Sequence, residues 1–158
     1  MAREDERSLQ ERYAPSSICF GCGPANSLGL HIRSFESDGE LIATWTARPE
    51  HEAFPGVLNG GIVGALLDCH ANWAAAMSLM RARGETRPPP TVTAEYQVRL
   101  TRPTPTEGPI TIRSRVVGTD GDRATAQGTI EAGGRVTATF EGTFVAVGPG
   151  HPAYHRWD

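Results

Sequence analysis

The chain has 158 residues, a length that predicts a single domain with its own core. Apolar residues make up 39% and charged residues 21% of it, and the formal net charge of −3 without a basic block argues against a nucleic-acid-binding protein. No apolar run is long enough for a transmembrane helix, and the first residues are too charged for a signal peptide. Three cysteines are an odd count that favours reduced thiols, so we expect a cytoplasmic protein. From the charge and the lack of a long apolar run, we expect it to bind neither nucleic acid nor membrane.

The first part of the chain is predicted to be irregular. Residues 4–12 are a short charged helix or a solvated arm, and we expect the arm. Residues 19–30 are rich in Gly, Pro and Asn, which predicts a structured loop. Two strands, 30–35 and 41–47, then flank a hairpin turn at 37–40 with Asp-Gly at its middle.

The loop contains the pair Cys19-x-x-Cys22, a spacing found in zinc sites. A zinc ion needs further ligands, and Cys69 and His70 would supply them only if the fold brought them close to the loop. We therefore predict no metal site.

The next segment predicts one long helix. Asn59 is a favourable N-cap, the helix runs from Gly60 to Arg81 or Arg83, and Gly84 ends it. Almost every face of this helix is apolar or small, so it should be buried. Its body nevertheless carries a single carboxylate, Asp68, which needs a partner or a task at a buried position.

The remainder of the chain is predicted to be β-structure. After the stiff Pro88-Pro89-Pro90 exit, four strands are expected, at 91–101, 110–117, 124–131 and 135–147.

The predicted order is thus two strands, one long helix and four strands of mostly antiparallel meander. A curved antiparallel sheet can wrap around an all-apolar helix, whereas a flat one cannot. We predict an α+β fold with about six strands around one central helix. The core domain spans residues 19–147, between an N-terminal arm (1–18) and a C-terminal tail (148–158).

The start of the helix resembles a known signature. Asn59-Gly60-Gly61, with the acid Asp68 nine residues after the asparagine, is similar to the His-Gly-Gly…Asp/Glu signature of hotdog-fold acyl-CoA thioesterases, and more narrowly to their PaaI-like branch. The preceding Pro55-Gly56-Val57-Leu58, the strand order after the helix and the Cys19-x-x-Cys22-Gly23 loop are similar as well. The resemblance covers roughly residues 19–147.

This resemblance implies a hotdog fold and a homodimer whose sheets join edge to edge, or a dimer of such dimers, with active sites between subunits. It also implies hydrolysis of an acyl-CoA to free acid and CoA, with no cofactor. The N-terminus of a helix independently suits this chemistry, because its free N–H groups can stabilise the negative charge that develops on a thioester carbonyl oxygen.

The resemblance also assigns roles to residues. The backbone N–H of Gly60 is the oxyanion donor, and Gly61 shapes the turn beside the substrate. Asp68 of the opposite subunit attacks the thioester or activates a water. By strand register, Thr93 matches a position that orients this water, with Thr91 as the alternative.

The chain departs from the family pattern at two positions. Asn59 stands where the family has histidine, and an amide forms hydrogen bonds but cannot carry a proton near neutral pH. Ala53 stands where some relatives have asparagine. We count Asn59 among the catalytic candidates, and His51, Phe54 and Gly61 as candidate substrate contacts.

Two other functions stay open. The chain could be a non-catalytic acyl-CoA-binding protein, because the histidine is missing. A hydratase or dehydratase would need a histidine paired with the acid, and His70 lies about 200° around the helix from Asp68, too far to share its site within one chain. We rank thioester hydrolysis first and the hydratase last.

Overall fold

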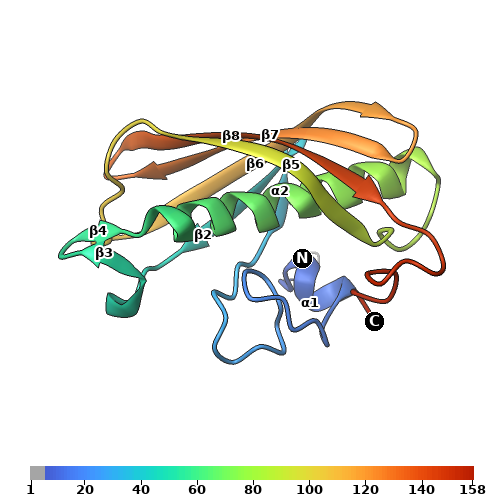
Figure 1. The fold of residues 1–158 in the computed structure, drawn as a ribbon, viewed down its shortest axis with the longest axis horizontal. Helices are drawn as coiled ribbons and strands as arrows, with labels where there is room; N and C mark the ends of the chain where they lie inside the picture. Colours follow the sequence, from blue (N-terminus) through green and yellow to red (C-terminus); the bar gives the residue numbers. More distant parts are fainter. Residues whose placement is uncertain (1–5) are drawn as a thin grey trace, which may run out of the picture.

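A long helix, α2 (Gly60–Ala82), lies along one face of a six-stranded sheet (Figure 1). This computed structural model describes residues 6–158. The helix ends within a residue of the predicted position, and Gly84 follows it with a left-handed φ of +64°. No helix within the described chain has both the length and the apolarity that a membrane span requires.

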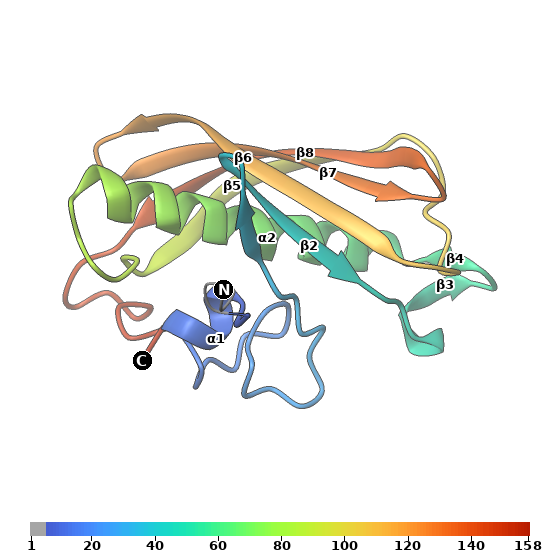
Figure 2. The ribbon, with the colours of Figure 1, turned by 180° about the vertical axis from the view of Figure 1, so that it is seen from behind.

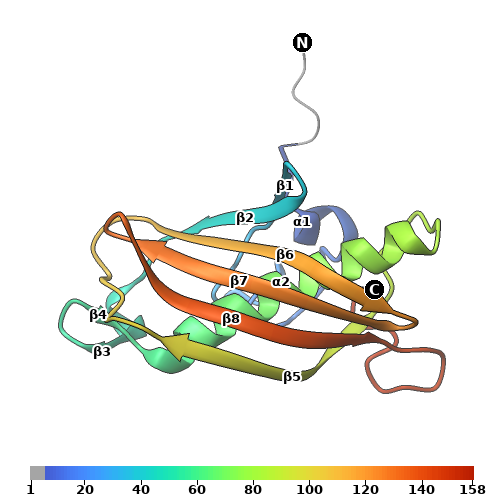
Figure 3. The same ribbon diagram turned by 90° about the horizontal axis from the view of Figure 1, so that it is seen from above.

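The sheet is antiparallel throughout, with strand order β1-β2-β6-β7-β8-β5 (Figure 3). Its strands are β1 (Phe35–Ser37), β2 (Glu40–Trp45), β5 (Thr91–Leu100), β6 (Ile110–Asp120), β7 (Arg123–Ala132) and β8 (Arg135–Ala146). The predicted α+β arrangement, with four strands after the helix, is confirmed.

Alternate residues of the central strands face the helix and form the core. The inward positions are buried and mostly apolar: Ile110, Ile112, Ala124, Ala126, Ile130, Ala138, Phe140 and Phe144. At Gly128 the helix approaches the sheet closely, because a Cβ there would lie 3.2 Å from Leu67 Cδ2 and 3.0 Å from a backbone oxygen. Every second residue of these strands therefore points towards α2 and packs against its buried face.

The sheet covers only one side of α2, and the N-terminal segment packs against another (Figures 1 and 2). This segment contains α1 (Leu9–Tyr13), which starts with a capping box between Ser8 and Glu11. Leu9 and Gln10 are almost completely buried. The prediction of a solvated arm was wrong for these residues, because Leu9 joins the core. Residues 1–5 of the predicted arm (1–18) lie outside the described residues.

The C-terminal tail also packs against the helix. Trp157 is buried, its ring lies 4.6 Å from that of Trp73, and its indole N–H donates to the carbonyl of Pro89 at 3.0 Å. The tail therefore covers a further part of α2 and belongs to the same core.

The predicted strand at 30–35 is wrong for most of its length, since β1 begins only at Phe35. The N–H groups of Leu30 and Ile32 donate to the carbonyls of Phe20 and Gly21, at 2.7 and 3.1 Å. These bonds tie the segment to the loop before it, although its apolar side chains are buried as a strand would bury them. The next turn is as predicted, with positive φ at both Asp38 and Gly39.

Residues 48–58, for which neither a helix nor a strand was predicted, contain regular structure. A 3₁₀ turn, η1 (Pro49–His51), leads into a small hairpin of β3 (Glu52–Phe54) and β4 (Val57–Leu58). This hairpin lies beside the start of α2 (Figures 1 and 3).

His70 is fully buried, on the opposite side of α2 from Asp68. Its Nε2 lies 2.9 Å from the carbonyl of Leu41, which can only accept, so Nε2 carries the proton. Its Nδ1 accepts from the hydroxyl of Ser34 at 2.8 Å, and Ser34 in turn accepts from Gln10. Burial lowers the pKa of His70 to about 4, so the imidazole is neutral and structural.

The depressed pKa of His70 predicts acid sensitivity. Between the folded pKa of about 4 and the usual value of 6.5, the unfolded state binds a proton that the folded state does not. The contribution of His70 to the free energy of unfolding is therefore full above about pH 6.5. It falls towards pH 4 by at most about 1.4 kcal/mol per pH unit. Urea unfolding at pH 7.5, 6 and 5 should show a smaller fall in the free energy of unfolding for His70→Gln than for wild type. His151→Gln, at an exposed position, should keep the wild-type slope. Identical slopes in all three proteins would contradict the assignment.

Candidate active site

The start of α2 leaves one backbone donor free. Asn59 caps the helix with its side-chain oxygen, which accepts the N–H groups of Gly61 and Ile62 at 2.8 and 3.2 Å. The N–H of Val63 bonds to the carbonyl of Asn59 at 3.1 Å. Within residues 6–158 the N–H of Gly60 has no acceptor, and Gly60 is exposed. A single N–H therefore points outward at the positive end of the helix dipole.

Two turns further along, Asp68 is held by β5. The hydroxyl of Thr93 donates to its Oδ1 at 2.7 Å. Burial raises the pKa of Asp68 above its usual value, and the hydrogen bond from Thr93 opposes this shift. The charge of Arg156 in the tail also lowers the pKa of Asp68, a contribution that sequence reasoning did not anticipate.

Thr91, the alternative to Thr93, has a different partner. Its hydroxyl donates to Oδ1 of Asn72 at 2.6 Å, and the residue is completely buried. Two successive turns of α2 are thus each hydrogen-bonded to a threonine of β5, Asp68 to Thr93 and Asn72 to Thr91. Of these two pairs, only that of Asp68 and Thr93 is partly exposed.

One chain cannot bring Gly60 and Asp68 together. They are eight residues apart on one helix, which separates them by about 12 Å along the axis. Gly61, Ala65 and Asp68 form a stripe of α2, the exposed stripe, that other elements leave at least partly uncovered. A site that uses both groups therefore needs a second copy of this stripe.

The edge of the sheet beside this stripe is open and carries two exposed apolar side chains. β5 is the last strand of the sheet and pairs only with β8 within the described residues. Tyr96 and Leu100 on it are 51% and 57% exposed. A long edge strand with apolar side chains is a ready surface for pairing with another strand.

The other two predicted substrate contacts lie near the helix start. His51 is buried, its Nδ1 accepts the N–H of Arg48 at 3.0 Å, and its carbonyl accepts the N–H of Asn59 at 2.9 Å. Burial lowers its pKa. Phe54 is exposed on β3. His51 thus supports the turn that leads to the helix cap, and Phe54 is available for contacts.

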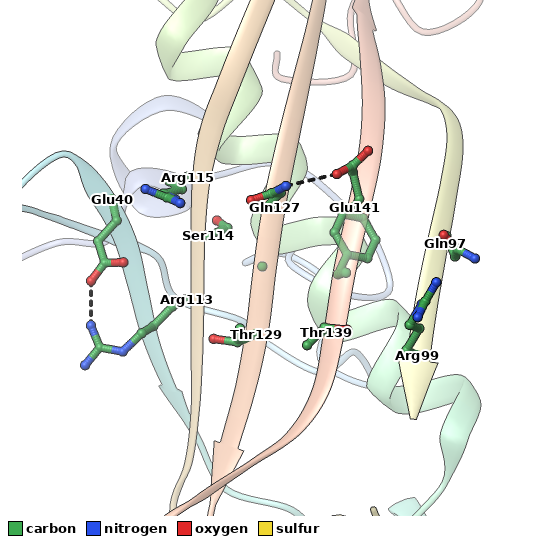
Figure 4. Close-up of a pocket in the computed structure, with 12 residues that line it drawn as sticks. Glu40, Gln97, Arg99, Arg113, Ser114, Arg115, Gln127, Thr129, Thr139 and Glu141 are labelled. Atoms are coloured by element: carbon green, nitrogen blue, oxygen red, sulfur yellow. Dashed lines mark hydrogen bonds and ion pairs between the residues drawn. The ribbon is translucent and has the colours of Figure 1, made fainter. Parts of the chain in front are cut away.

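A separate hollow of about 520 Å³ lies across strands β5 to β8 (Figure 4). Most of its lining residues are polar or charged. Arg113 forms an ion pair with Glu40, and the side-chain amide of Gln127 donates to the carboxylate of Glu141. None of the residues predicted for catalysis lines it. We therefore place the candidate active site at α2 and β5, not in this hollow.

The structure also brings together three cysteines that sequence reasoning left apart. The sulfur atoms of Cys19, Cys22 and Cys69 all lie within 4.8 Å of one another. The thiols of Cys22 and Cys69, together with the backbone N–H groups of Cys22 and Gly21, hold the pKa of Cys19 well below its usual range. The spacing of Cys19 and Cys22 was the available signal, but the approach of Cys69 depends on the path of the loop.

The fold is similar to those of several solved thioesterase superfamily proteins. One is 26% identical over 92% of this chain and 68% of its own, with a TM-score of 0.66. Another, from Shewanella loihica PV-4, is 22% identical over 79% of this chain and 98% of its own, with a TM-score of 0.64. The E. coli PaaI protein, from the phenylacetic acid degradation operon, is 16% identical over 75% of this chain and 81% of its own, with a TM-score of 0.63.

By sequence alone, no family model and no curated protein matches the chain. The likeness is therefore carried by the arrangement of the helix and the sheet. The chain shares the hotdog fold of the thioesterase superfamily proteins, PaaI among them.

Proposed function

We propose that the protein hydrolyses an acyl-CoA thioester to a free acid and CoA, in a homodimer whose sites combine Gly60 of one subunit with Asp68 of the other. The observation that carries this proposal is the single unpaired N–H of Gly60 at a capped helix start. A donor fixed in this way costs no reorganisation when negative charge develops on a carbonyl oxygen.

In the proposed reaction, the thioester oxygen accepts the N–H of Gly60. Asp68 takes a proton from a water as that water attacks the carbonyl carbon, and Thr93 holds the carboxylate in place. The tetrahedral intermediate then breaks its carbon–sulfur bond and releases the free acid and CoA thiolate. The thiolate takes up the proton that Asp68 removed from the water, and Asp68 is ionised again. Direct attack by the carboxylate, through an anhydride that water later cleaves, uses the same two groups.

Asn59 fits this scheme without carrying a proton. By engaging the N–H groups of Gly61 and Ile62, its side chain leaves only the N–H of Gly60 for the substrate. The missing side chains of Gly60 and Gly61 allow a thioester to approach the backbone closely. The loss of the family histidine therefore leaves the oxyanion donor in place.

The dimer would form through the exposed stripe and the free edge of β5. Pairing of two β5 strands extends the sheets edge to edge and buries Tyr96 and Leu100. Two-fold symmetry then gives two equivalent sites, each with a glycine from one subunit and a carboxylate from the other.

The test is thiol release from short, long and aromatic acyl-CoAs, followed by subunit complementation. Asp68→Asn and Gly60→Pro each remove one half of the site. Refolding the two inactive variants together should restore about a quarter of wild-type activity, because half of the dimers are mixed and each mixed dimer has one intact site.

Other results would contradict the proposal in distinct ways. Tight acyl-CoA binding by calorimetry with no turnover would identify a non-catalytic binding protein. Formation of a 3-hydroxyacyl product from an enoyl-CoA would identify a hydratase. Wild-type activity of either single variant would remove that group from the reaction, and loss of activity in both variants without restoration on mixing would contradict a site shared between subunits.

A further inference from the structure

A cluster of three thiols lies beside the candidate active site and has no part in the proposed reaction. Cys19 and Cys22 come from the loop before β1, and Cys69 comes from α2, the residue after Asp68. These are the only cysteines of the chain. In the described part of the chain, no other group of three or more His, Cys, Asp or Glu side chains gathers its ligand atoms so closely.

The distances suit coordination of one metal ion. Sulfur ligands at the corners of a tetrahedral zinc site, with zinc–sulfur bonds of about 2.3 Å, lie about 3.8 Å apart. The sulfur atoms of Cys19 and Cys69 are 3.7 Å apart, and no pair of the cluster exceeds 4.8 Å. Small shifts would therefore place all three sulfurs around one ion.

The backbone around the cluster is shaped to hold the sulfurs together. A Cβ on Gly21 would lie 2.3 Å from the sulfur of Cys69, so only glycine lets the loop approach that thiol. A Cβ on Gly23 would lie 2.4 Å from the backbone nitrogen of Cys19. The two glycines thus let the Cys19-x-x-Cys22 turn close tightly over α2.

The cluster also has a supporting hydrogen bond. The indole N–H of Trp73 donates to the sulfur of Cys22 at 3.4 Å, and both residues are buried. Donors of this kind orient thiolate ligands and tune the metal that they hold.

We propose that Cys19, Cys22 and Cys69 bind one thiophilic d¹⁰ metal ion, Zn²⁺ or Cu(I), that fastens the N-terminal loop to α2. Three thiolates complete a trigonal Cu(I) site and leave one position on tetrahedral Zn²⁺ for water or an anion. Binding requires deprotonated sulfurs, so it releases protons to the solvent. The prediction of no metal site was made because Cys69 is far from the loop in the sequence. The fold brings its sulfur atom within 4.8 Å of the other two.

The experiment measures metal directly and does not depend on enzyme activity. Full-length protein is purified anaerobically with reductant, and bound zinc and copper are counted by mass spectrometry. Metal-free protein is then titrated with Co²⁺, as a spectroscopic substitute for zinc, and separately with Cu(I) against a chromogenic chelator. We expect one equivalent of Co²⁺ with thiolate charge-transfer absorption and displacement by Zn²⁺, or one equivalent of Cu(I) without a Co²⁺ signal.

Variants locate the site. Cys19→Ser, Cys22→Ser and Cys69→Ser should each weaken binding at least about tenfold, whereas His155→Gln, which removes an exposed histidine that pairs with Asp158, should bind like wild type. Metal should also raise the melting temperature of wild type by several degrees and that of Cys69→Ser by much less. Because the Co²⁺ and Cu(I) titrations use wild type, they hold even where a variant fails to fold.

Two results would overturn the proposal. One is reduced wild-type protein that takes up neither Co²⁺, Zn²⁺ nor Cu(I) at micromolar concentration. The other is stoichiometric binding that all three serine variants retain, which would place the metal elsewhere.

Discussion

Replacing Asp68 with asparagine is expected to lower kcat/KM for thioester hydrolysis by about a hundredfold or more. The variant keeps the size of the side chain and an oxygen that accepts from Thr93, but it cannot take a proton from water or attack a carbonyl. Burial raises the pKa of Asp68, which means that its ionised form is unfavourable in the folded protein. The melting temperature of Asp68→Asn should therefore equal or exceed that of wild type.

Asp38→Asn is the matched control. It makes the same chemical change in an exposed turn, at a left-handed φ of +48° that asparagine tolerates. Steady-state thiol release and thermal unfolding of wild type, Asp68→Asn and Asp38→Asn test whether the carboxylate of Asp68 takes part in the reaction. Wild-type turnover in Asp68→Asn, or an equal loss in Asp38→Asn, would remove the carboxylate from the mechanism.

Replacing Gly60 with proline is expected to lower kcat by about 10²- to 10³-fold, as for loss of one oxyanion donor. Gly60 is the first residue of α2, where proline is favoured because the N–H makes no helical bond. The ψ of +133° at Asn59 also suits a residue that precedes proline. The substitution therefore replaces the donating hydrogen of the proposed site by the proline ring and leaves the helix intact.

Gly60→Ala separates the N–H from the added bulk. Alanine keeps the donor, and its Cβ lies 3.2 Å from the end of the Leu100 side chain, which is exposed and can move. Gly60→Ala keeps the N–H but narrows the approach of the thioester, so we expect it to retain clearly more activity than Gly60→Pro and both variants to show wild-type circular dichroism. Equal loss of kcat in the two variants would mean that space, and not the N–H, matters at this position.

Local signals predicted a large part of the fold. The cap at Asn59, the stop at Gly84 and the turn at Asp38-Gly39 depend on residues a few positions apart, and the structure shows all three. The strands after the helix follow from their alternating pattern in the same way. Thr93 was singled out by family resemblance and strand register, as a residue that orients the water, and the structure places its hydroxyl 2.7 Å from Oδ1 of Asp68.

The parts that the sequence could not predict depend on contacts between distant segments. Ile32 lies in a run that looks like a strand, but its N–H bonds to Gly21 in the preceding loop. Trp157 reaches Trp73 across half of the chain, and Cys69 meets the loop cysteines only because α1 and the loop cover α2. No periodicity or cap encodes such contacts, so the terminal segments were predicted to be peripheral.

The cap at Asn59 also constrains how this protein can evolve. Its oxygen satisfies two N–H groups at once, a task that histidine performs poorly at a helix start. Replacement of Asn59 by histidine would leave at least one of these N–H groups without its acceptor and would cost about 1 kcal/mol in helix stability. A side chain that could carry a proton beside the N–H of Gly60 would therefore first weaken the start of α2, so the cap favours an oxygen acceptor at position 59.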